Sequence, residues 1–424
     1  MTEEYLHFVW KHKRFEYRLL KTHDGQELEV LNFGFHNSNS GPDFLNAEVR
    51  IAGIRFSGHV EMHLCSSDWY RHGHQNDQAY NAVVLHVVYN CDKSVLRADG
   101  SHIPQLSLKD RMDEMPFWRF EQWQSQKQWI VCAPLVKFWP DQAGTLWIKR
   151  LAWNRFERRW GQIEERLRKG ESWQQLAWEI LCRGFGMQVN SDAFEALARL
   201  LNYKHVLYAA DMGPIYLEAL LFGSSGMLQQ EPLVSHPHVQ QLKQAYQLLK
   251  EMWHLESLPA HMWKFSRLRP ANFPSLRMAQ LAAFISKDRQ FVLNLELIQS
   301  SDGELNMGPF WHWHYSLRKK SKTQVDPYPG EMFYKHLWLN VVLPIRFLSG
   351  RWSDDNKQSE DAIDTLESLS AEQNTIYKRF KELGFTAKTA LETQGLLELY
   401  RHYCLPRKCL QCAMGKHLLL KPSN

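Results

Sequence analysis

Two carboxylates and one histidine in the first part of the chain could bind a metal ion. Asp43 follows Gly41-Pro42, and Glu61 stands two positions before His63. Alternate residues of a β-strand point to the same side, so Glu61 and His63 share a face if this segment is a strand. Asp43 can approach Glu61 from a neighbouring hairpin strand. We predict a Mg²⁺ or Mn²⁺ site at Asp43 and Glu61, with His63 placed to orient water or steady a phosphate during phosphodiester hydrolysis.

A second group of candidate metal ligands follows shortly afterwards. His72, His74 and Asp77 offer two imidazoles and a carboxylate within six positions. This combination suits Zn²⁺, Mn²⁺ or Fe²⁺. Three interpretations stay open: these residues border the pocket of the acidic pair, they form a separate zinc site, or they lie in a solvated loop.

Three cysteines crowd together near the other end of the chain, in the pattern His402-x-Cys404-x4-Cys409-x2-Cys412. Two cysteines separated by two residues can present both sulfur atoms to one tetrahedral ion. His402 or His417 would complete a zinc site of three cysteines and one histidine. A distant cysteine would instead complete a four-cysteine site for zinc or an iron–sulfur cluster. The alternative is three small buried side chains.

Two basic segments could hold a nucleic acid. Residues 149–169 carry eight lysines and arginines against three glutamates, and residues 267–277 carry three arginines and two prolines. Such a face can follow a phosphate backbone, although it can equally be an ordinary solvated surface. The residues predicted to contact nucleic acid are Arg155, Arg158, Arg159, Arg267, Arg269 and Arg277.

The elements that must position the acidic pair can be predicted from periodicity. Residues 4–13 have helical spacing, and residues 15–35 read as a hairpin that turns at Asp24-Gly25. Residues 44–64 read as two strands that turn at Ala52-Gly53, and residues 83–90 as a buried strand. The expected order is helix, hairpin, two strands, helical linker and strand.

This order, together with Pro42-Asp43 and Glu61-x-His63, resembles the PD-(D/E)xK nuclease superfamily over roughly the first quarter of the chain. The resemblance implies that Asp43 and Glu61 hold Mg²⁺. His63 stands where that superfamily usually has lysine. Over its whole length the chain resembles a family of uncharacterised bacterial proteins, a domain of unknown function, and that second resemblance implies no activity.

The remainder of the chain has helical spacing, so we predict an α+β protein. Its expected parts are a small mixed α/β nuclease-like domain at 1–110, a mostly helical domain at 111–350, and a helical segment with the cysteine cluster at 351–424. A composition of 44% hydrophobic and 23% charged residues excludes a disordered chain. The net charge of +5 permits a polyanionic partner without requiring one.

Several targeting and cofactor motifs are not found in the sequence. We find no apolar run long enough for a membrane helix, no signal-peptide pattern and no GxxxxGK[ST] phosphate loop. Together with the scattered cysteines elsewhere, this predicts a cytoplasmic protein with no membrane partner and no nucleoside triphosphate site.

The leading hypothesis is a divalent-metal-dependent nuclease that acts on DNA or RNA, or an inactive relative of one. The first alternative is a non-catalytic nucleic-acid-binding or scaffold protein whose acidic pair is structural. The second is a zinc hydrolase built on His72, His74 and Asp77. The nuclease hypothesis requires Asp43 and Glu61 to lie close together.

Overall fold

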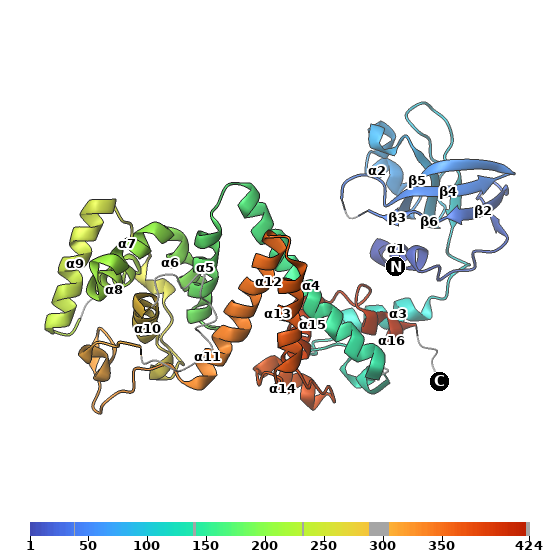
Figure 1. Cartoon of the computed structure of the whole chain (residues 1–424). Helices are drawn as coiled ribbons and strands as arrows, with labels where there is room; N and C mark the ends of the chain where they lie inside the picture. The colour runs from blue at the N-terminus through green and yellow to red at the C-terminus, as the bar shows by residue number, and fades with distance from the viewer. Residues whose placement is uncertain (38, 139–140, 231–232, 288–304, 421–424) are drawn as a thin grey trace. The chain divides into compact units, whose positions relative to one another are not determined.

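The computed structural model describes residues 1–37, 39–138, 141–230, 233–287 and 305–420 (Figure 1). Contacts divide the chain into two compact units. The first comprises Met1–Trp147, Glu382–Gly384 and Leu399–Asn424, and the second comprises Ile148–Lys381 and Phe385–Glu398. The predicted α+β class is confirmed. The predicted boundaries at residues 110 and 350 do not coincide with these limits, because the last part of the chain returns to the first unit.

The first unit is built on a seven-stranded mixed sheet in the order β1-β2-β4-β5-β6-β7, with β3 paired to β4. Strands β4 and β5 are antiparallel, whereas β5, β6 and β7 are parallel. The strands are β1 (Leu20–Lys21), β2 (Glu27–Asn32), β3 (Phe35–His36), β4 (Phe44–Ile51), β5 (Ile54–Cys65), β6 (Val83–Asn90) and β7 (Gln105–Ser107).

Two connections in this sheet decide where the candidate ligands lie. Ala52 and Gly53 both have positive φ, at 46° and 84°, and form the predicted tight turn between β4 and β5. Parallel strands need a longer crossover, so the chain between β5 and β6 runs through α2 (Asp68–Arg71), η1 (His74–Asn76) and η2 (Gln78–Tyr80). At Gly58 a Cβ atom would lie 2.3 Å from the Ala82 carbonyl oxygen, so glycine lets the end of the crossover approach β5 closely.

Helix α1 (Glu3–Lys11) packs against β5, as the spacing of its apolar residues predicts. Thr2 caps it, because the Thr2 hydroxyl accepts a hydrogen bond from the Tyr5 amide. Tyr5, Phe8 and Trp10 are buried, and the Trp10 indole donates to the Phe33 carbonyl at 3.0 Å. This packing fixes the side of α1 that carries His7.

The first unit is completed by segments from two distant parts of the sequence. These are α3 (Met115–Ser125), η3 (Ala133–Phe138), the π-helical turn η10 (Tyr400–Cys404) and α16 (Ala413–Leu419). The Arg407 guanidinium donates to the carbonyls of Gln124 and Gln126, and the Gln124 amide returns a bond of 3.2 Å to the Arg407 carbonyl. The chain between η10 and α16 is thereby tied to the end of α3.

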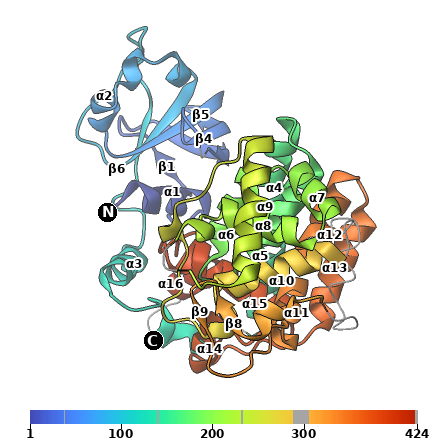
Figure 2. The same ribbon diagram turned by 90° about the vertical axis from the view of Figure 1, so that its left-hand side faces the viewer.

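The second unit is mostly helical (Figure 2). It contains most of α4 (Asp141–Arg168), then α5 (Trp173–Phe185), α6 (Ser191–Leu200), α7 (Tyr203–Met212), α8 (Pro214–Ser224), α9 (Pro237–Trp253), α10 (Pro274–Lys287), the small hairpin β8 (His314–Ser316) and β9 (Lys319–Lys320), α11 (Glu331–Leu337), α12 (Leu343–Trp352), α13 (Asn356–Ser368), α14 (Thr375–Glu382) and α15 (Ala390–Leu399). Helices α8 and α9 pack side by side, and a Cβ atom on Gly223 would lie 2.0 Å from the Tyr246 ring. None of the helices in the described ranges has the length and apolar composition needed to span a bilayer.

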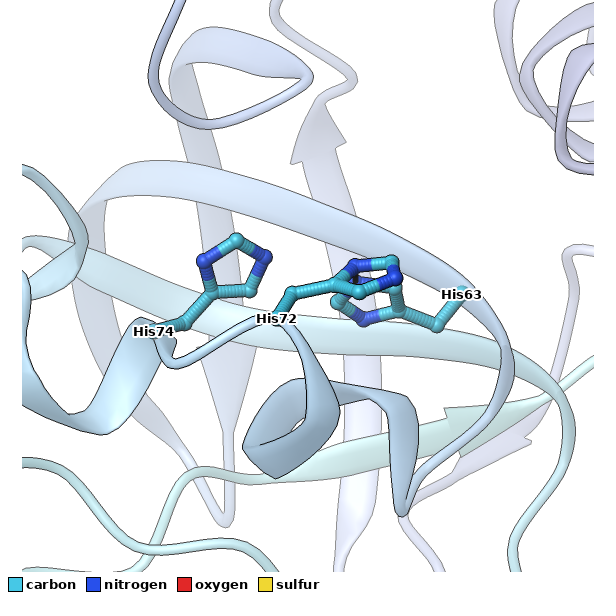
Figure 3. A group of neighbouring side chains, drawn as sticks. All are labelled: His63, His72 and His74. Carbon is cyan, nitrogen blue, oxygen red and sulfur yellow. Dashed lines mark hydrogen bonds between the residues drawn. The ribbon is translucent and has the colours of Figure 1, made fainter.

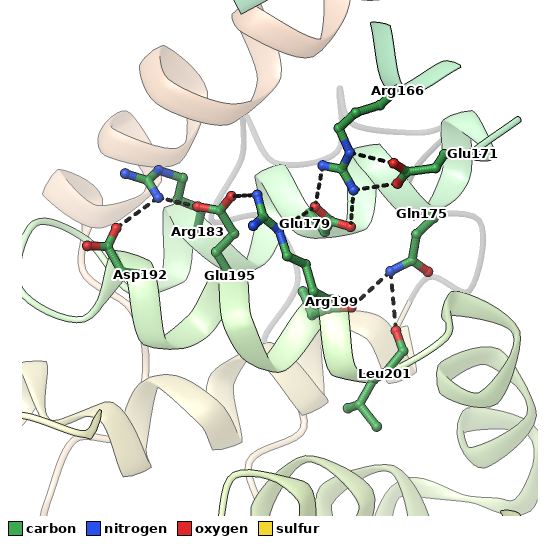
Figure 4. Close-up of polar contacts among 10 residues, drawn as sticks. Arg166, Glu171, Gln175, Glu179, Arg183, Asp192, Glu195, Arg199 and Leu201 are labelled. Carbon is green, nitrogen blue, oxygen red and sulfur yellow. Dashed lines mark hydrogen bonds and ion pairs between the residues drawn. The ribbon is translucent and has the colours of Figure 1, made fainter. Parts of the chain in front are cut away.

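A buried glutamate joins three of these helical segments (Figure 4). Glu179 on α5 accepts two hydrogen bonds from Arg166 of α4, at 2.7 and 2.9 Å, and one from Arg199 of α6 at 3.3 Å. Arg166 also contacts Glu171, and Arg199 also contacts Glu195 at 2.5 Å. Part of the basic face predicted on α4 is therefore used inside the unit.

Candidate metal centre

Strand β5 places Glu61 and His63 on the same buried stretch. Residues Val60 to His63 are all buried, and Glu61 and His63 are 5% and 1% exposed. In the parallel pairing, Glu61 lies opposite His86 of β6. The alternation predicted from the sequence therefore brings Glu61 and His63 together, and it adds His86 to their surroundings.

The predicted acidic pair does come together. The Asp43 amide donates to Glu61 Oε2 at 3.2 Å, and Asp43 Oδ2 accepts from the Met62 amide at 2.9 Å. From α1, His7 Nε2 lies 3.2 Å from Asp43 Oδ2. Burial alone would lower the pKa of His7, but the Asp43 carboxylate outweighs it and raises that pKa. Burial, with the nearby Asp43 charge, raises the pKa of Glu61, although His74 opposes this shift.

Three histidines lie close together, His63 on β5 and His72 and His74 on the crossover that follows it (Figure 3). His63 Nε2 lies 3.0 Å from His72 Nδ1 and 3.6 Å from Glu61 Oε1, and His74 Nε2 lies 3.3 Å from the same oxygen. On its other side, His63 Nδ1 lies 2.9 Å from His86 Nε2. His63, His72 and His74 form a group whose ligand nitrogens all lie within 4.8 Å of one another.

The crossover holds His72 and His74 in place. Gly73 between them has φ 76°, which bends the chain from α2 into η1. The His74 ring stacks on Tyr80 at 3.8 Å and meets the edge of Trp69 at 5.4 Å. His72 is exposed, whereas His74 is half-buried. One side of the cluster is therefore rigid and the other side opens to solvent.

The buried imidazoles of this cluster are neutral. Burial, together with the neighbouring histidines, lowers the pKa of His63 to about 2. Burial lowers the pKa of His86 to about 3. A neutral imidazole has one free lone pair, as metal ligation requires. A proton on His63 Nδ1, donated to His86, leaves His63 Nε2 facing His72 and Glu61 as a ligand atom.

The distances in the cluster suit one ion. Bonds of about 2.0–2.1 Å put two ligand atoms of a tetrahedral zinc ion about 3.3 Å apart, and the measured separations are 3.0, 3.3 and 3.6 Å. The His74 Nε2 atom is buried and, in the described chain, makes no hydrogen bond, although the Glu61 carboxylate is near. Three nitrogens with one carboxylate favour Zn²⁺, Mn²⁺ or Fe²⁺ over Mg²⁺.

Asp77 does not join these ligands. Its Oδ1 accepts the Ala79 amide at 2.9 Å and caps η2, and its side chain is exposed. In the sequence analysis, His86 was placed only within the predicted buried strand 83–90, and His7 only within the predicted helix 4–13. The polar residue inside the apolar run 83–90 was a signal for His86, whereas His7 had none, because its contact to Asp43 joins distant segments.

The arginines predicted on α4 are engaged inside the second unit. Arg155 is buried and donates to Gln394 at 2.8 Å, and Arg158 holds Glu398 through two hydrogen bonds of 3.2 and 2.9 Å. Arg159 is half-buried. Arg155 and Arg158 are thus internal partners of α15 and are not available as a free basic surface.

The second basic segment is divided between surface and interior. Arg267 and Arg269 are exposed, while Arg277 is buried, donates to Gln280 and Asn272 at 2.7 Å each, and lies over the Phe333 ring. Arg269 and Arg277 line a cavity of about 440 Å³. All six predicted arginines belong to the second unit, whereas the histidine cluster belongs to the first.

The cysteine pattern near the end of the chain lies in the first unit. Cys409 and Cys412 are buried, and Cys404 and His402 are half-buried. None of the seven cysteines forms a disulfide. The pKa of each of the three clustered thiols is raised, first by burial and, for Cys404 and Cys409, then by neighbouring cysteines.

The chain belongs to a family described as protein of unknown function (DUF2851), whose sequence model matches residues 3–375. No curated protein and no solved structure matches it. The likeness of the first unit to the PD-(D/E)xK nucleases therefore stays a prediction.

Proposed function

We propose that this member of the family is a hydrolase that cleaves phosphodiester bonds with a divalent transition-metal ion held by Glu61, His63, His72 and His74. One observation carries the proposal. A buried carboxylate oxygen lies 3.3 and 3.6 Å from two imidazole nitrogens, and a third imidazole nitrogen lies 3.0 Å from one of these. A cation held by the three imidazoles, whose ligand nitrogens all lie within 4.8 Å of one another, would also neutralise the adjacent Glu61 carboxylate.

Burial explains why an ion is expected. A buried carboxylate without compensation is costly, and so is a buried nitrogen without a partner. Glu61 is 5% exposed, and within the described residues the buried Nε2 atom of His74 makes no hydrogen bond, although it lies 3.3 Å from Glu61 Oε1. A bound cation removes both penalties and lowers the pKa of Glu61 towards its usual range. The predicted Mg²⁺ or Mn²⁺ site at Asp43 and Glu61 is thus revised to a nitrogen-rich set of ligands, which favours Zn²⁺, Mn²⁺ or Fe²⁺ over Mg²⁺.

The cluster has an open side on which a reaction could occur. His72 is exposed, so water and a phosphate could reach the ion beside it. A bound metal lowers the pKa of water and supplies hydroxide near neutral pH. The hydroxide would attack phosphorus, the phosphorus–oxygen ester bond would break, and the leaving oxygen would take a proton. His7, whose pKa is raised by Asp43, would donate that proton.

The phosphodiester class rests on the likeness to PD-(D/E)xK nucleases, in which acidic residues of neighbouring strands hold the metal. Here Asp43 directly precedes β4 and Glu61 lies in β5. DNA or RNA is the proposed substrate. Of the arginines predicted to contact nucleic acid, Arg267 and Arg269 of the second unit are exposed.

One observation favours a non-catalytic protein as the second candidate. Asp43 uses its amide and its Oδ2 atom in hydrogen bonds to Glu61 and to the Met62 amide. This is the arrangement expected if Asp43 only supports β5. In that case the ion would stabilise the first unit, and the protein would bind nucleic acid or act as a scaffold.

Titration with Mn²⁺ tests the site, because Mn²⁺ prefers nitrogen and oxygen ligands and does not compete for thiolates. We expect Glu61→Gln and His74→Ala to weaken Mn²⁺ binding at least about 100-fold. The exposed His23 serves as the matched control, and His23→Ala should bind like wild type. Equal binding by all variants would show that the cluster is not the metal site.

Hydrolysis of an activated phosphodiester, of single- and double-stranded DNA and of RNA is then measured with the same Mn²⁺-loaded proteins. Activity in the wild type and in His23→Ala, lost in Glu61→Gln, would support the hydrolase. Binding of Mn²⁺ without hydrolysis of any of these substrates would favour the non-catalytic candidate.

A further inference from the structure

A fourth cysteine joins the three near the end of the chain. Cys132, directly before η3, is 9% exposed, and its sulfur lies 4.0 Å from the Met414 sulfur in α16. Cys412 is the residue before α16, and Cys409 lies three positions earlier. Cys132 is thereby placed beside the cysteine-rich turn, although 282 positions separate it from Met414.

The electrostatic surroundings of Cys132 and Cys404 agree with this placement. Burial raises the pKa of Cys132 to about 12, and the next causes are Cys412 and Cys409. For Cys404 the causes after burial are Cys412, Cys132 and Cys409. Each of these thiols is therefore near at least two others.

The backbone around the four cysteines is held independently of any metal. Arg407, with φ 56°, bends the chain between Cys404 and Cys409, and its guanidinium donates to two carbonyls of the segment that leads to Cys132. Trp129 stacks on Tyr400 at 4.9 Å. The two segments are thus preorganised, which lowers the entropy cost of bringing four ligands together.

We propose that Cys132, Cys404, Cys409 and Cys412 form a four-thiolate metal centre, with Cys132 in the position that the sequence pattern offered to His402. Four thiolates take Zn²⁺ or an iron–sulfur cluster. Zn–S bonds of about 2.3 Å require sulfur atoms about 3.8 Å apart. In the ranges that the structure describes, the four sulfurs are not among the groups whose ligand atoms all lie within 4.8 Å. To bind one zinc ion, the four thiolates would therefore have to move closer together.

Such a centre would join the two separated parts of the first unit. The whole second unit lies between Cys132 and Cys404 in the sequence. A metal that binds all four thiolates closes this long loop, and its binding free energy becomes part of the folding free energy. The inferred role is structural, and it does not depend on the hydrolase proposed above.

The metal content of the purified full chain tests this centre. The chain is produced without oxygen, and its iron, sulfide and zinc are measured together with its visible absorption. We expect iron and sulfide with a charge-transfer band, or one zinc per chain without a band. Cys132→Ser should lose this metal at least tenfold, while Cys91→Ser, a half-buried cysteine of the same unit outside the cluster, should keep it.

X-ray absorption of the wild-type metal covers the case in which Cys132→Ser does not fold. Sulfur as the only protein ligand type supports the four-thiolate centre, and a nitrogen ligand would return the fourth position to His402 and overturn the proposal. Metal-free wild type, or full metal content in folded Cys132→Ser, would also overturn it. Neither result bears on Mn²⁺ binding at the histidine cluster.

Discussion

Acidification of the metal-free protein should loosen the strands that carry the histidine cluster. His63 and His86 have pKa values of about 2 and about 3, against 6.5 for an unperturbed histidine. Below pH 6.5 the unfolded chain binds a proton at each of them, whereas the folded chain does not. The stability is therefore present above pH 6.5 and is lost as the pH falls towards the folded pKa values.

The size of this loss follows from the two shifts. Between pH 7 and pH 5 each histidine costs about 1.9 kcal/mol, so the pair costs about 4 kcal/mol. Glu61 acts in the opposite direction, because a raised carboxyl pKa lets the folded state take up a proton first. We expect a net loss of about 2–4 kcal/mol.

Hydrogen exchange of the β5 and β6 amides measures this loss, after correction for the intrinsic effect of pH, in the presence of a chelator. His63→Gln removes one titrating group and should reduce the loss by about 2 kcal/mol. A change below about 1 kcal/mol in the wild type would refute the reasoning, since it would mean that the buried histidines take up protons without opening the sheet.

Three packing features give further predictions. Glu179→Ala leaves two arginines without their buried partner and should lower the stability of the second unit by about 3 kcal/mol in urea unfolding. The control Glu164→Ala removes an exposed ion pair and should cost no more than about 0.5 kcal/mol. Equal costs for the two variants would contradict this account. Gly223→Ala places a methyl group 2.0 Å from the Tyr246 ring and should cost about 1–3 kcal/mol. Combining it with Tyr246→Leu should cost less than the sum of the two single changes, and strict additivity would argue against the contact. Gly58→Ala should push the crossover away from β5 and weaken Mn²⁺ binding in calorimetry, and unchanged affinity would show that the crossover tolerates the shift.

Short-range sequence patterns correctly predicted the contacts between strands that are neighbours in the sequence. The period of two along β5 and the turn at Ala52-Gly53 are sufficient to place Glu61, His63 and Asp43 together. The spacing of the crossover histidines identified His72 and His74. These contacts depend on strands that are neighbours in both sequence and space.

Distant contacts were outside the reach of such patterns. The basic face of α4 was interpreted as a surface because its acidic partner, Glu398, lies 240 positions beyond Arg158. The contacts of Cys132 and His7 could not be predicted for the same reason, since nothing near these residues in the sequence indicates their partners. In each case tertiary packing decides whether a charged or sulfur-bearing side chain is free.

The return of residues 399–420 to the first unit has a consequence for synthesis. A ribosome makes the sheet and Cys132 first, then the whole helical unit, and only afterwards η10 and α16. Domains generally fold in the order in which they emerge. The sheet can therefore fold early. Cys132 is made soon after the sheet, but the three cysteines proposed to bind a metal with it are added only when translation is almost finished.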